Sequence, residues 1–388
     1  MGEALRTLSA YVHIPFCASR CGYCDFNTYT APELQRDGTT VSPATYGDRV
    51  VREINLNATA SSFSSQHRPL HSVFFGGGTP TLLAADELVR ILSSLREAFG
   101  LTQSAEVTTE ANPDSVNQEY LATLRAGGFT RISFGHQSSS PDVLRVLDRT
   151  HTPGRTWEAV RWAREAGFAH VSVDLIYGSP QETDADLKRT LDDVAKADVD
   201  HVSAYSLIVE PGTRLAAQIA RGELPAPSDD VAAHRYEIID QSLSSLGMSW
   251  YEVSNWSKPN GQCHHNIAYW QNQDWLGIGP GAHAHHDGRR MWNVKHPAAW
   301  AAQIDAGNLP IADEEMLDPQ AIRRENIMLG LRLHEGIDTA LLSDRALIQA
   351  ELAVEEGLLN SQAFQAGRAV LTFQGRLLAD GLVARLWD

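Results

Sequence analysis

Short runs of apolar and β-branched residues alternate with longer amphipathic segments over the first 210 residues. Each run has the length and composition of a buried strand, and the segments between the runs carry the period of about 3.6 residues that is typical of helices packed on a sheet. Polar residues follow where the runs end. We expect strands at 11–16, 72–75, 106–110, 131–134, 170–176 and 201–208, with intervening helices that include 84–99, 115–126 and 184–197.

This repeat predicts an α/β fold, because parallel strands that are joined by helices are covered on their faces by those helices. Six strand–helix units indicate a barrel, either complete or incomplete. In such barrels the functional groups gather at the carboxyl ends of the strands. Residues 27–42 are polar, contain Pro and Gly, and are typical of an exposed connecting loop.

The pattern changes after residue 210 and again near residue 310. We expect a core of strand–helix units at 1–210, an accessory region at 211–310, and a small helical C-terminal domain of winged-helix type at 311–388. The further expected elements are helices at 231–246, 323–333 and 348–356, a short helix from 371, and strands at 250–253 and 382–387.

Three histidines of the accessory region, His285, His286 and His296, are expected in loops.

Composition and charge narrow the functional classes. The net charge is −16 and the chain has no basic run, so we expect no nucleic-acid partner. No segment approaches the roughly 18 apolar residues of a membrane span, and residues 1–6 lack the basic-then-apolar pattern of a signal peptide. Three of the four cysteines are clustered, which suits a reducing compartment. We therefore expect a cytoplasmic protein.

Cys17, Cys21 and Cys24 follow the first expected strand in a C-x3-C-x2-C pattern. Three thiols at this spacing can converge on one metal centre, and an iron–sulfur cluster normally takes four protein ligands. One loop therefore leaves one iron open to another molecule. Structural zinc needs a closed set of four ligands, for which His13 is a candidate, and three neighbouring cysteines cannot all form disulfides among themselves. The spacing favours an iron–sulfur cluster.

Several polar or glycine-rich positions stand at the ends of the other strands. The segment 76–80, Gly-Gly-Gly-Thr-Pro, allows a ligand to approach the backbone closely, or forms a tight turn. Glu110 and Gln137 end the third and fourth strands, Asp174 lies on the fifth, and Arg149 can pair with a carboxylate. Each of these side chains taken alone is more typical of a structural hydrogen bond or a surface charge than of a ligand contact.

The cysteine pattern, with an aromatic residue before its last cysteine, resembles the radical S-adenosylmethionine (SAM) superfamily. Residues 11–16 and 75–80 are similar to the branch that holds the oxygen-independent coproporphyrinogen III oxidases and their haem-chaperone relatives, and the resemblance extends over nearly the whole chain. It implies an incomplete barrel of six units. It also implies a [4Fe-4S] cluster in which one iron has no protein ligand; this iron binds SAM, and reductive cleavage of SAM yields a radical. The implied SAM contacts are Tyr11, Gly77, Gly78, Thr79, Glu110, Gln137, Arg149 and Asp174.

A second motif, H-N-x-x-Y-W, begins at His265 and resembles a signature of the haem-chaperone branch. In a helix, His265 and Tyr269 share one face. Imidazole is a common axial ligand of haem iron, and aromatic rings can pack on a porphyrin. From the residue types alone, a buried structural histidine in an aromatic cluster is the favoured interpretation. The resemblance implies haem contacts at His265, Tyr269 and Trp270, with Cys263 either a rival ligand or a packed thiol.

This chain departs from the pattern of the oxidases in two places, and both departures favour the haem-chaperone activity of the branch over the oxidase activity. The oxidases carry a further cysteine where this chain has Phe26, and a longer extension than the ten residues before Tyr11. We therefore expect a protein that binds haem as cargo and hands it to haem-requiring proteins, respiratory ones included, with transient membrane contact. The alternatives are a coproporphyrinogen III oxidase and a radical SAM methyltransferase; no catalytic residue follows from the sequence.

Overall fold

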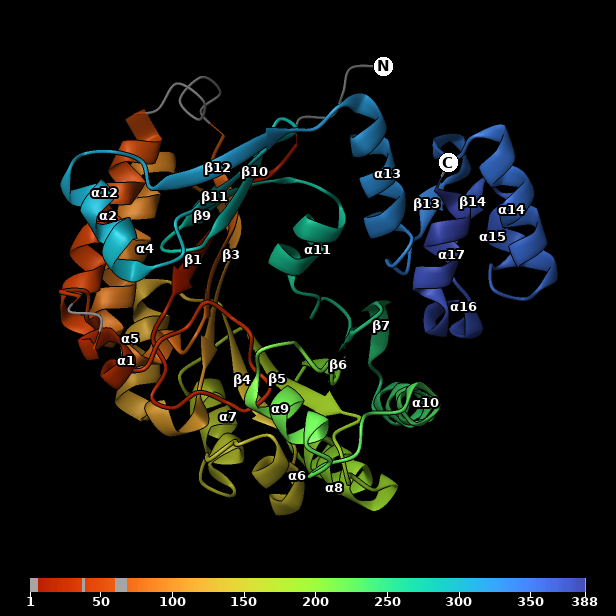
Figure 1. The fold of residues 1–388 in the computed structure, drawn as a ribbon, viewed down its shortest axis with the longest axis horizontal. Coiled ribbons are helices and arrows are strands. Elements are labelled where there is room, and N and C mark those ends of the chain that lie inside the picture. Colours follow the sequence, from red (N-terminus) through yellow and green to blue (C-terminus); the bar gives the residue numbers. More distant parts are fainter. Residues whose placement is uncertain (1–5, 37–38, 60–67, 388) are drawn as a thin grey trace.

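The computed structural model describes residues 6–36, 39–59 and 68–387, and its central element is a sheet of twelve strands (Figure 1). Six of these strands pair in parallel in chain order, as the sequence predicts. They confirm the α/β fold. The six are β1 (Leu8–Ile14), β2 (Leu70–Gly77), β3 (Leu101–Ala111), β4 (Arg131–Gln137), β5 (His170–Tyr177) and β6 (His201–Ser206).

Helices cover the outer face of these strands (Figure 1). In α4 (Ala85–Phe99) the buried side chains Leu88, Ile91, Leu92 and Leu95 recur at helical spacing, so that one stripe packs on the sheet. The loop expected at 27–42 contains a short helix, α1 (Ala31–Arg36), and its residues 37–38 lie outside the described part of the chain. The other covering helices are α2 (Pro43–Thr59), α5 (Gln118–Gly127), α6 (Pro141–Val146), α7 (Arg155–Glu165) and α8 (Asp184–Lys196).

The barrel is incomplete because both edges of the parallel sheet are extended by further strands instead of meeting. On one side β9 is parallel to β1, and β10, β11 and β12 follow it in antiparallel order; on the other side β8 and β7 follow β6. Their bounds are β7 (Ser249–Glu252), β8 (Asn255–Ser257), β9 (Asp274–Ile278), β10 (His283–His286), β11 (Arg289–Asn293) and β12 (Ile311–Met316).

The accessory segment also supplies α9 (Arg214–Ala220), α10 (Asp229–Ser245), α11 (His264–Trp270) and α12 (Pro297–Asp305). Helix α11 lies between the two sheet edges and contacts β2 and α13 (Figure 1). The expectation that His285 and His286 are loop residues is wrong, because both belong to β10 and are buried. His285 Nδ1 lies 3.0 Å from Gln273 O, and His286 Nδ1 lies 3.5 Å from Asp274 Oδ2.

The C-terminal part has a hydrophobic core of its own that begins at Ile327 and ends at Leu386. The strand expected at 382–387 is wrong, because Leu382, Val383 and Leu386 have helical spacing and face inward from α17. The short β13–β14 pair is the wing-like element. The elements are α13 (Pro319–Gly330), β13 (Ile337–Asp338), α14 (Asp344–Glu355), α15 (Ser361–Gln365), β14 (Arg368–Ala369), α16 (Phe373–Leu377) and α17 (Ala379–Leu386).

The division of the chain at residues 210 and 310 stays a prediction. Strand β12 pairs with β11 of the main sheet, whereas the second core begins only at Ile327. None of the helices in the described ranges combines the length and apolar character needed to cross a membrane; residues 1–5, where a signal peptide was considered, lie outside those ranges.

Candidate cofactor site

The three clustered cysteines lie on the loop after β1, at the carboxyl ends of the parallel strands. Cys17, Cys21 and Cys24 are free, half-buried thiols that line one cavity of about 440 Å³. The loop is fixed at its start by a hydrogen bond from Cys17 N to Tyr29 O at 3.0 Å. Burial raises the pKa of Cys17 and of Cys24, so both thiols are protonated in the metal-free chain near neutral pH.

The fourth cysteine cannot complete a set of four thiolates at this loop. Cys263 is buried at the amino end of the barrel, where its Sγ lies 3.4 Å from Glu106 Oε1. Three thiols on one wall of a roomy cavity fit a [4Fe-4S] cluster with one iron free of protein thiolate. Ligation of such a cluster by Cys17, Cys21 and Cys24 stays a prediction.

Arg149 places a fixed cation beside the cysteines. Its Nη1 lies 3.6 Å from Cys21 Sγ, and its Nη2 donates to Gly135 O at 2.8 Å. The buried Nε of Arg149 has no hydrogen-bond partner among the residues that the structure describes. Arg149 lines the cavity, and a guanidinium there fits the carboxylate of a bound amino acid moiety.

The glycine segment after β2 is pressed against the end of β1. Gly78 N donates to Ile14 O at 2.8 Å, and a Cβ on Gly78 would come within 2.4 Å of Phe16 O. Gly77 has a φ of 108°, and a Cβ there would meet the His13 ring at 2.6 Å. Side chains are excluded at both positions, so the bare backbone faces the cavity.

Two half-buried carboxyl groups face the same cavity. Glu110 Oε2 accepts from Gly77 N at 3.2 Å, and Asp174 Oδ1 accepts from Ser133 Oγ at 3.0 Å. Burial, together with the nearby charge of Asp174, raises the pKa of Glu110 to about 8; burial also raises the pKa of Asp174. A cationic ligand group would favour the charged form of both, as the ammonium and sulfonium of SAM would.

Seven of the eight predicted SAM residues line this one cavity, and Tyr11 does not. The Tyr11 side chain lines a smaller chamber of about 130 Å³ nearer the amino end of the barrel, with its hydroxyl 3.0 Å from His13 Nδ1. Glu110, Asp174 and Tyr205 line both spaces, so Tyr11 lies one layer below the cysteines. Direct SAM contact by Tyr11 stays a prediction.

Sequence reasoning missed Tyr205. Its side chain is 45% exposed although it belongs to β6, because it borders both hollow spaces instead of packing in the core. The position of a polar residue near the carboxyl end of a parallel strand, which identified Glu110 and Gln137, could have found Tyr205 as well.

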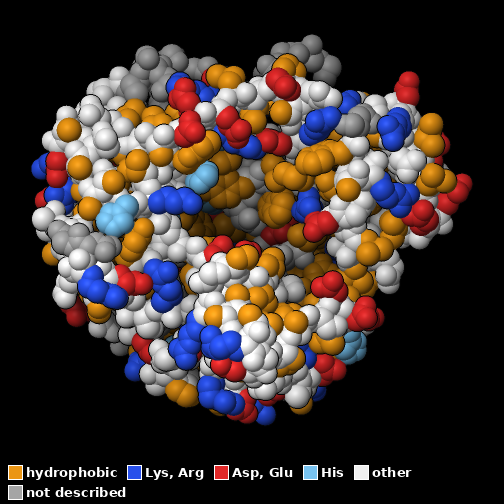
Figure 2. All heavy atoms as spheres, viewed as in Figure 1, with side chains coloured by type: hydrophobic (Ala, Val, Ile, Leu, Met, Phe, Trp, Pro, Cys, Tyr) orange, Lys and Arg blue, Asp and Glu red, His pale blue; other side chains and the backbone are white. Residues whose placement is uncertain are grey.

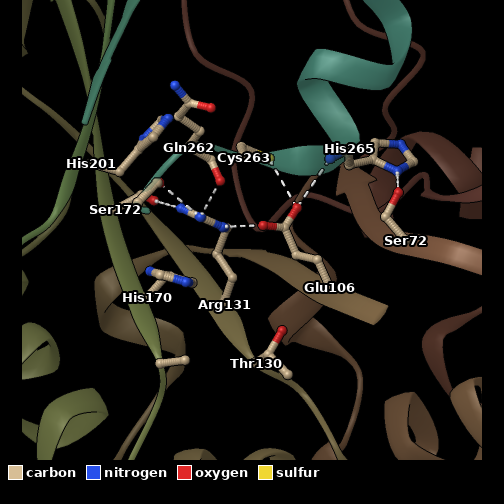
Figure 3. Close-up of polar contacts among 12 residues, drawn as sticks. Ser72, Glu106, Thr130, Arg131, His170, Ser172, His201, Gln262, Cys263 and His265 are labelled. Carbon is tan, nitrogen blue, oxygen red and sulfur yellow. Dashed lines mark hydrogen bonds and ion pairs between the residues drawn. The ribbon is translucent and has the colours of Figure 1, made fainter. Parts of the chain in front are cut away.

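The H-N-x-x-Y-W stretch forms α11 near the amino ends of the strands, on the side of the barrel opposite to the cysteine loop. Figure 3 shows how buried polar contacts hold its first turn: Glu106 accepts from His265 N at 3.1 Å and pairs with Arg131 at 2.9 Å. Arg131 Nη2 donates to the carbonyls of Gly261 and Gln262, each at 2.8 Å. An ion pair inside the barrel thus anchors the segment that enters α11.

His265 is buried, and both of its ring nitrogens are engaged. Nδ1 lies 2.8 Å from Ser72 Oγ, and Nε2 lies 3.0 Å from Tyr269 OH, so His265 and Tyr269 do share a helix face. Burial lowers the pKa of His265 to about 4, which keeps the ring neutral. Ligation of haem iron by His265 requires one of these hydrogen bonds to open. Haem contact by His265, Tyr269 and Trp270 stays a prediction.

Comparisons with known proteins agree with this geometry. A model of the radical SAM superfamily matches residues 11–194. Heme chaperone HemW of Mycobacterium tuberculosis is 47% identical over 376 residues, which cover 97% of this chain and 94% of that protein. HemW of Bacillus subtilis is 32% identical over 382 residues, or 96% and 97% of the two chains.

A solved structure of coproporphyrinogen III oxidase (HemN) from Escherichia coli has the same fold, with a TM-score of 0.82. It is 24% identical in sequence, and the match covers 99% of this chain and 91% of that one. The incomplete barrel is therefore a known architecture for a radical SAM protein. By these comparisons the chain belongs to the radical SAM superfamily and, within it, to the family of the HemW proteins.

Proposed function

We propose that this protein binds haem and delivers it to haem-requiring proteins. The observation that carries the proposal is the 47% identity to the mycobacterial haem chaperone over 97% of this chain. Phe26 supports it, because the oxidase pattern has a further cysteine at this position. The proposed acceptors are haem proteins, respiratory ones included, reached in the cytoplasm or during transient contact with a membrane.

The residues around the cofactor cavity have separate proposed roles. When bound, the [4Fe-4S] cluster and SAM supply one-electron chemistry, and Cys17, Cys21 and Cys24 hold the cluster. Glu110 and Asp174 balance the positive charges of SAM. The remaining proposed SAM contacts, from the glycine segment, β4 and the loop after α6, are Gly77, Gly78, Thr79, Gln137 and Arg149.

Coproporphyrinogen III oxidation is the competing function, and one anaerobic experiment separates the two. Reconstituted protein is offered haem and coproporphyrinogen III in parallel, with SAM and a reductant. We expect a haem absorption band that saturates with added haem and no decarboxylated product. Product formed in proportion to the protein would contradict the proposal, as would a failure to bind haem.

Delivery is tested separately from binding. Haem-loaded protein is mixed with a haem-free acceptor such as apomyoglobin, which serves as a spectroscopic probe of released haem. We expect the acceptor spectrum to develop, with haem lost in equal amount from the donor. Haem that never leaves the donor would contradict a delivery role.

The predicted haem ligand is tested by His265→Ala. His264→Ala is the matched control, because His264 precedes it on α11 but is exposed. Weaker haem binding in the first variant alone, with unchanged iron content, would support His265. Equal affinity in both variants would remove it from the haem site.

A further inference from the structure

Helix α11 bridges the two sides of the incomplete barrel. The segment that carries it leaves β8, which lies beyond β6 at one side, and returns to the sheet at β9, which lies beside β1 at the other. Figure 2 shows a hollow in the middle of this face, next to the place where Figure 1 shows α11. An element in this position controls access to the space behind it.

The space behind α11 is the smaller chamber, of about 130 Å³. His265, Asn266 and Tyr269 line it from the helix, and Phe74 lines it from β2. Small-molecule pockets occupy roughly 300–1,000 Å³, so the closed chamber is too small for a porphyrin. His265 is also only 2% exposed. Haem therefore reaches this histidine only if α11 moves.

The helix is held by few apolar contacts. None of its side chains belongs to a hydrophobic cluster in the described part of the chain. Ile267, Tyr269 and Trp270 are only half-buried, and the buried Nε1 of Trp270 has no hydrogen-bond partner among the described residues. An element with so few buried apolar contacts opens at a lower free energy than the core strands and helices do.

The start of α11 is fixed more firmly than the rest of it. Glu106 accepts from His265 N at 3.1 Å, and Arg131 binds the carbonyls of Gly261 and Gln262. Glu106 and Arg131 are themselves joined by the buried ion pair between β3 and β4. The first turn is therefore the natural pivot for a movement of the helix.

Side-chain contacts hold the helix against the chamber. His265 Nδ1 lies 2.8 Å from Ser72 Oγ, and the ring stacks on Phe74 with 5.2 Å between centroids and 25° between planes. Asn266 Nδ2 donates to Glu252 Oε1 at 3.0 Å. When these contacts open, Phe74 presents an aromatic face to the chamber and a ring nitrogen of His265 becomes free.

We infer that α11 is the gate of the haem site: it pivots outward on its anchored start, and haem enters behind it and packs on Phe74. This inference rests on the proposed function, since it concerns the entry of the same cargo to the site predicted at His265. A porphyrin is planar and apolar enough to replace the His265 ring on Phe74. The competing arrangement is haem on the outer side of a closed α11, against Tyr269 and Trp270.

Hydrogen exchange of the full chain, followed by mass spectrometry with and without haem, separates the two arrangements. We expect the amides of 266–270 to exchange faster when haem is bound, because a helix of seven residues frays once it leaves its packing partners. Haem on the outer side of a closed helix would slow their exchange instead.

The second test is the rate of haem association, followed by absorbance, in Ser72→Ala. This substitution removes a contact of the closed gate, so association and apparent affinity should rise by about two- to tenfold. Ser9→Ala is the matched control, since Ser9 Oγ lies 2.8 Å from Ser72 Oγ and its loss keeps the contact between Ser72 and His265. Phe74→Ala should instead release haem faster, because it removes the aromatic face.

Slower exchange of α11 in the haem-bound wild type, or wild-type association in Ser72→Ala, would overturn the gate while leaving haem binding itself intact. A wild type that binds no haem would instead overturn the proposed function. Faster exchange of α11 with haem, faster association in Ser72→Ala and the wild-type rate in Ser9→Ala would support the gate.

Discussion

Glu106 and Arg131 form an ion pair inside the barrel, with 2.9 Å between Arg131 Nε and Glu106 Oε2 and with neither side chain more than 4% exposed. The pair joins β3 to β4 and also binds the backbone that leads into α11 (Figure 3). A buried ion pair adds little to the free energy of unfolding compared with apolar residues in the same place, but the loss of one partner leaves the other charge buried without compensation. It therefore makes the position of α11 sensitive to single substitutions.

Arg131→Met should lower the free energy of unfolding by about 3–5 kcal/mol, because it leaves the Glu106 carboxylate buried without its partner. Urea unfolding followed by tryptophan fluorescence measures the change. Arg145→Met is the control: Arg145 pairs with Asp142 on the surface, with both side chains more than 70% exposed, and should cost less than about 1 kcal/mol. Equal effects of the two substitutions would contradict the anchoring role.

Replacement of any one of Cys17, Cys21 and Cys24 by Ser should abolish stable cluster assembly, because one loop supplies all the protein thiolates. Cys263→Ser should keep the wild-type amount of iron and sulfide, since this thiol bonds Glu106 at the other end of the barrel. Iron and acid-labile sulfide are measured after anaerobic reconstitution. Cluster loss in Cys263→Ser would mean that the fourth thiolate comes from Cys263 and that no iron is open.

Glu110→Gln should change how the stability of the cluster-free protein depends on pH. The pKa of Glu110 is raised to about 8 in the fold, from about 4.5 when unfolded, so the folded state binds the extra proton between these values. The contribution of Glu110 to the free energy of unfolding is fully present below pH 4.5. It is lost as the pH rises toward 8, by at most about 1.4 kcal/mol per pH unit.

The measurement for Glu110 is urea unfolding at a series of pH values between 4.5 and 9. The stability of Glu110→Gln relative to the wild type should rise with pH through this window, because the amide never becomes charged. Parallel pH curves for the two proteins would show that Glu110 titrates normally and would contradict its burial beside Asp174.

Gly78→Ala should weaken SAM binding and destabilise the fold by about 1–3 kcal/mol, because the new methyl group would come within 2.4 Å of the Phe16 carbonyl. The shift would move the end of β1, from which the cysteine loop starts. Gly381→Ala in α17 is the control, since no atom lies within 4 Å of a Cβ there and alanine favours a helix. Equilibrium dialysis with labelled SAM compares the two variants. Equal SAM affinity would contradict the close packing of Gly78 against the Phe16 carbonyl.

The sequence predicted the six parallel strands and the cysteine loop because both signals are local. Apolar runs such as 131–134 and 170–176 lie wholly within single strands, and the cysteine spacing is contained in one loop. The fate of His285 was not predictable in this way, because β10 is a short antiparallel strand whose burial depends on β9 and β11. Leu382 and Leu386 were ambiguous between strand and helix until their core was known.

The sequence also could not predict which segments that are distant in the chain lie side by side in the fold. Nothing in the spacing of His265 or Cys263 shows whether the chain returns to the carboxyl or the amino ends of the strands. The contacts of Ser72, near the amino end of β2, and of Glu106, its partner in register on β3, settle that question. Tyr11 was matched to the SAM residues by resemblance alone, and its side chain faces the chamber beneath them.

The central claim is that three thiolates hold a cluster whose fourth iron is open to SAM inside the cavity shared with Glu110 and Asp174. The electron paramagnetic resonance spectrum of the reduced, reconstituted protein, recorded with and without saturating SAM, tests it most directly. We predict that SAM changes the spectrum, because a direct ligand alters the electronic environment of the open iron. An identical spectrum in both samples, from protein that carries its full complement of iron and sulfide, would contradict the claim.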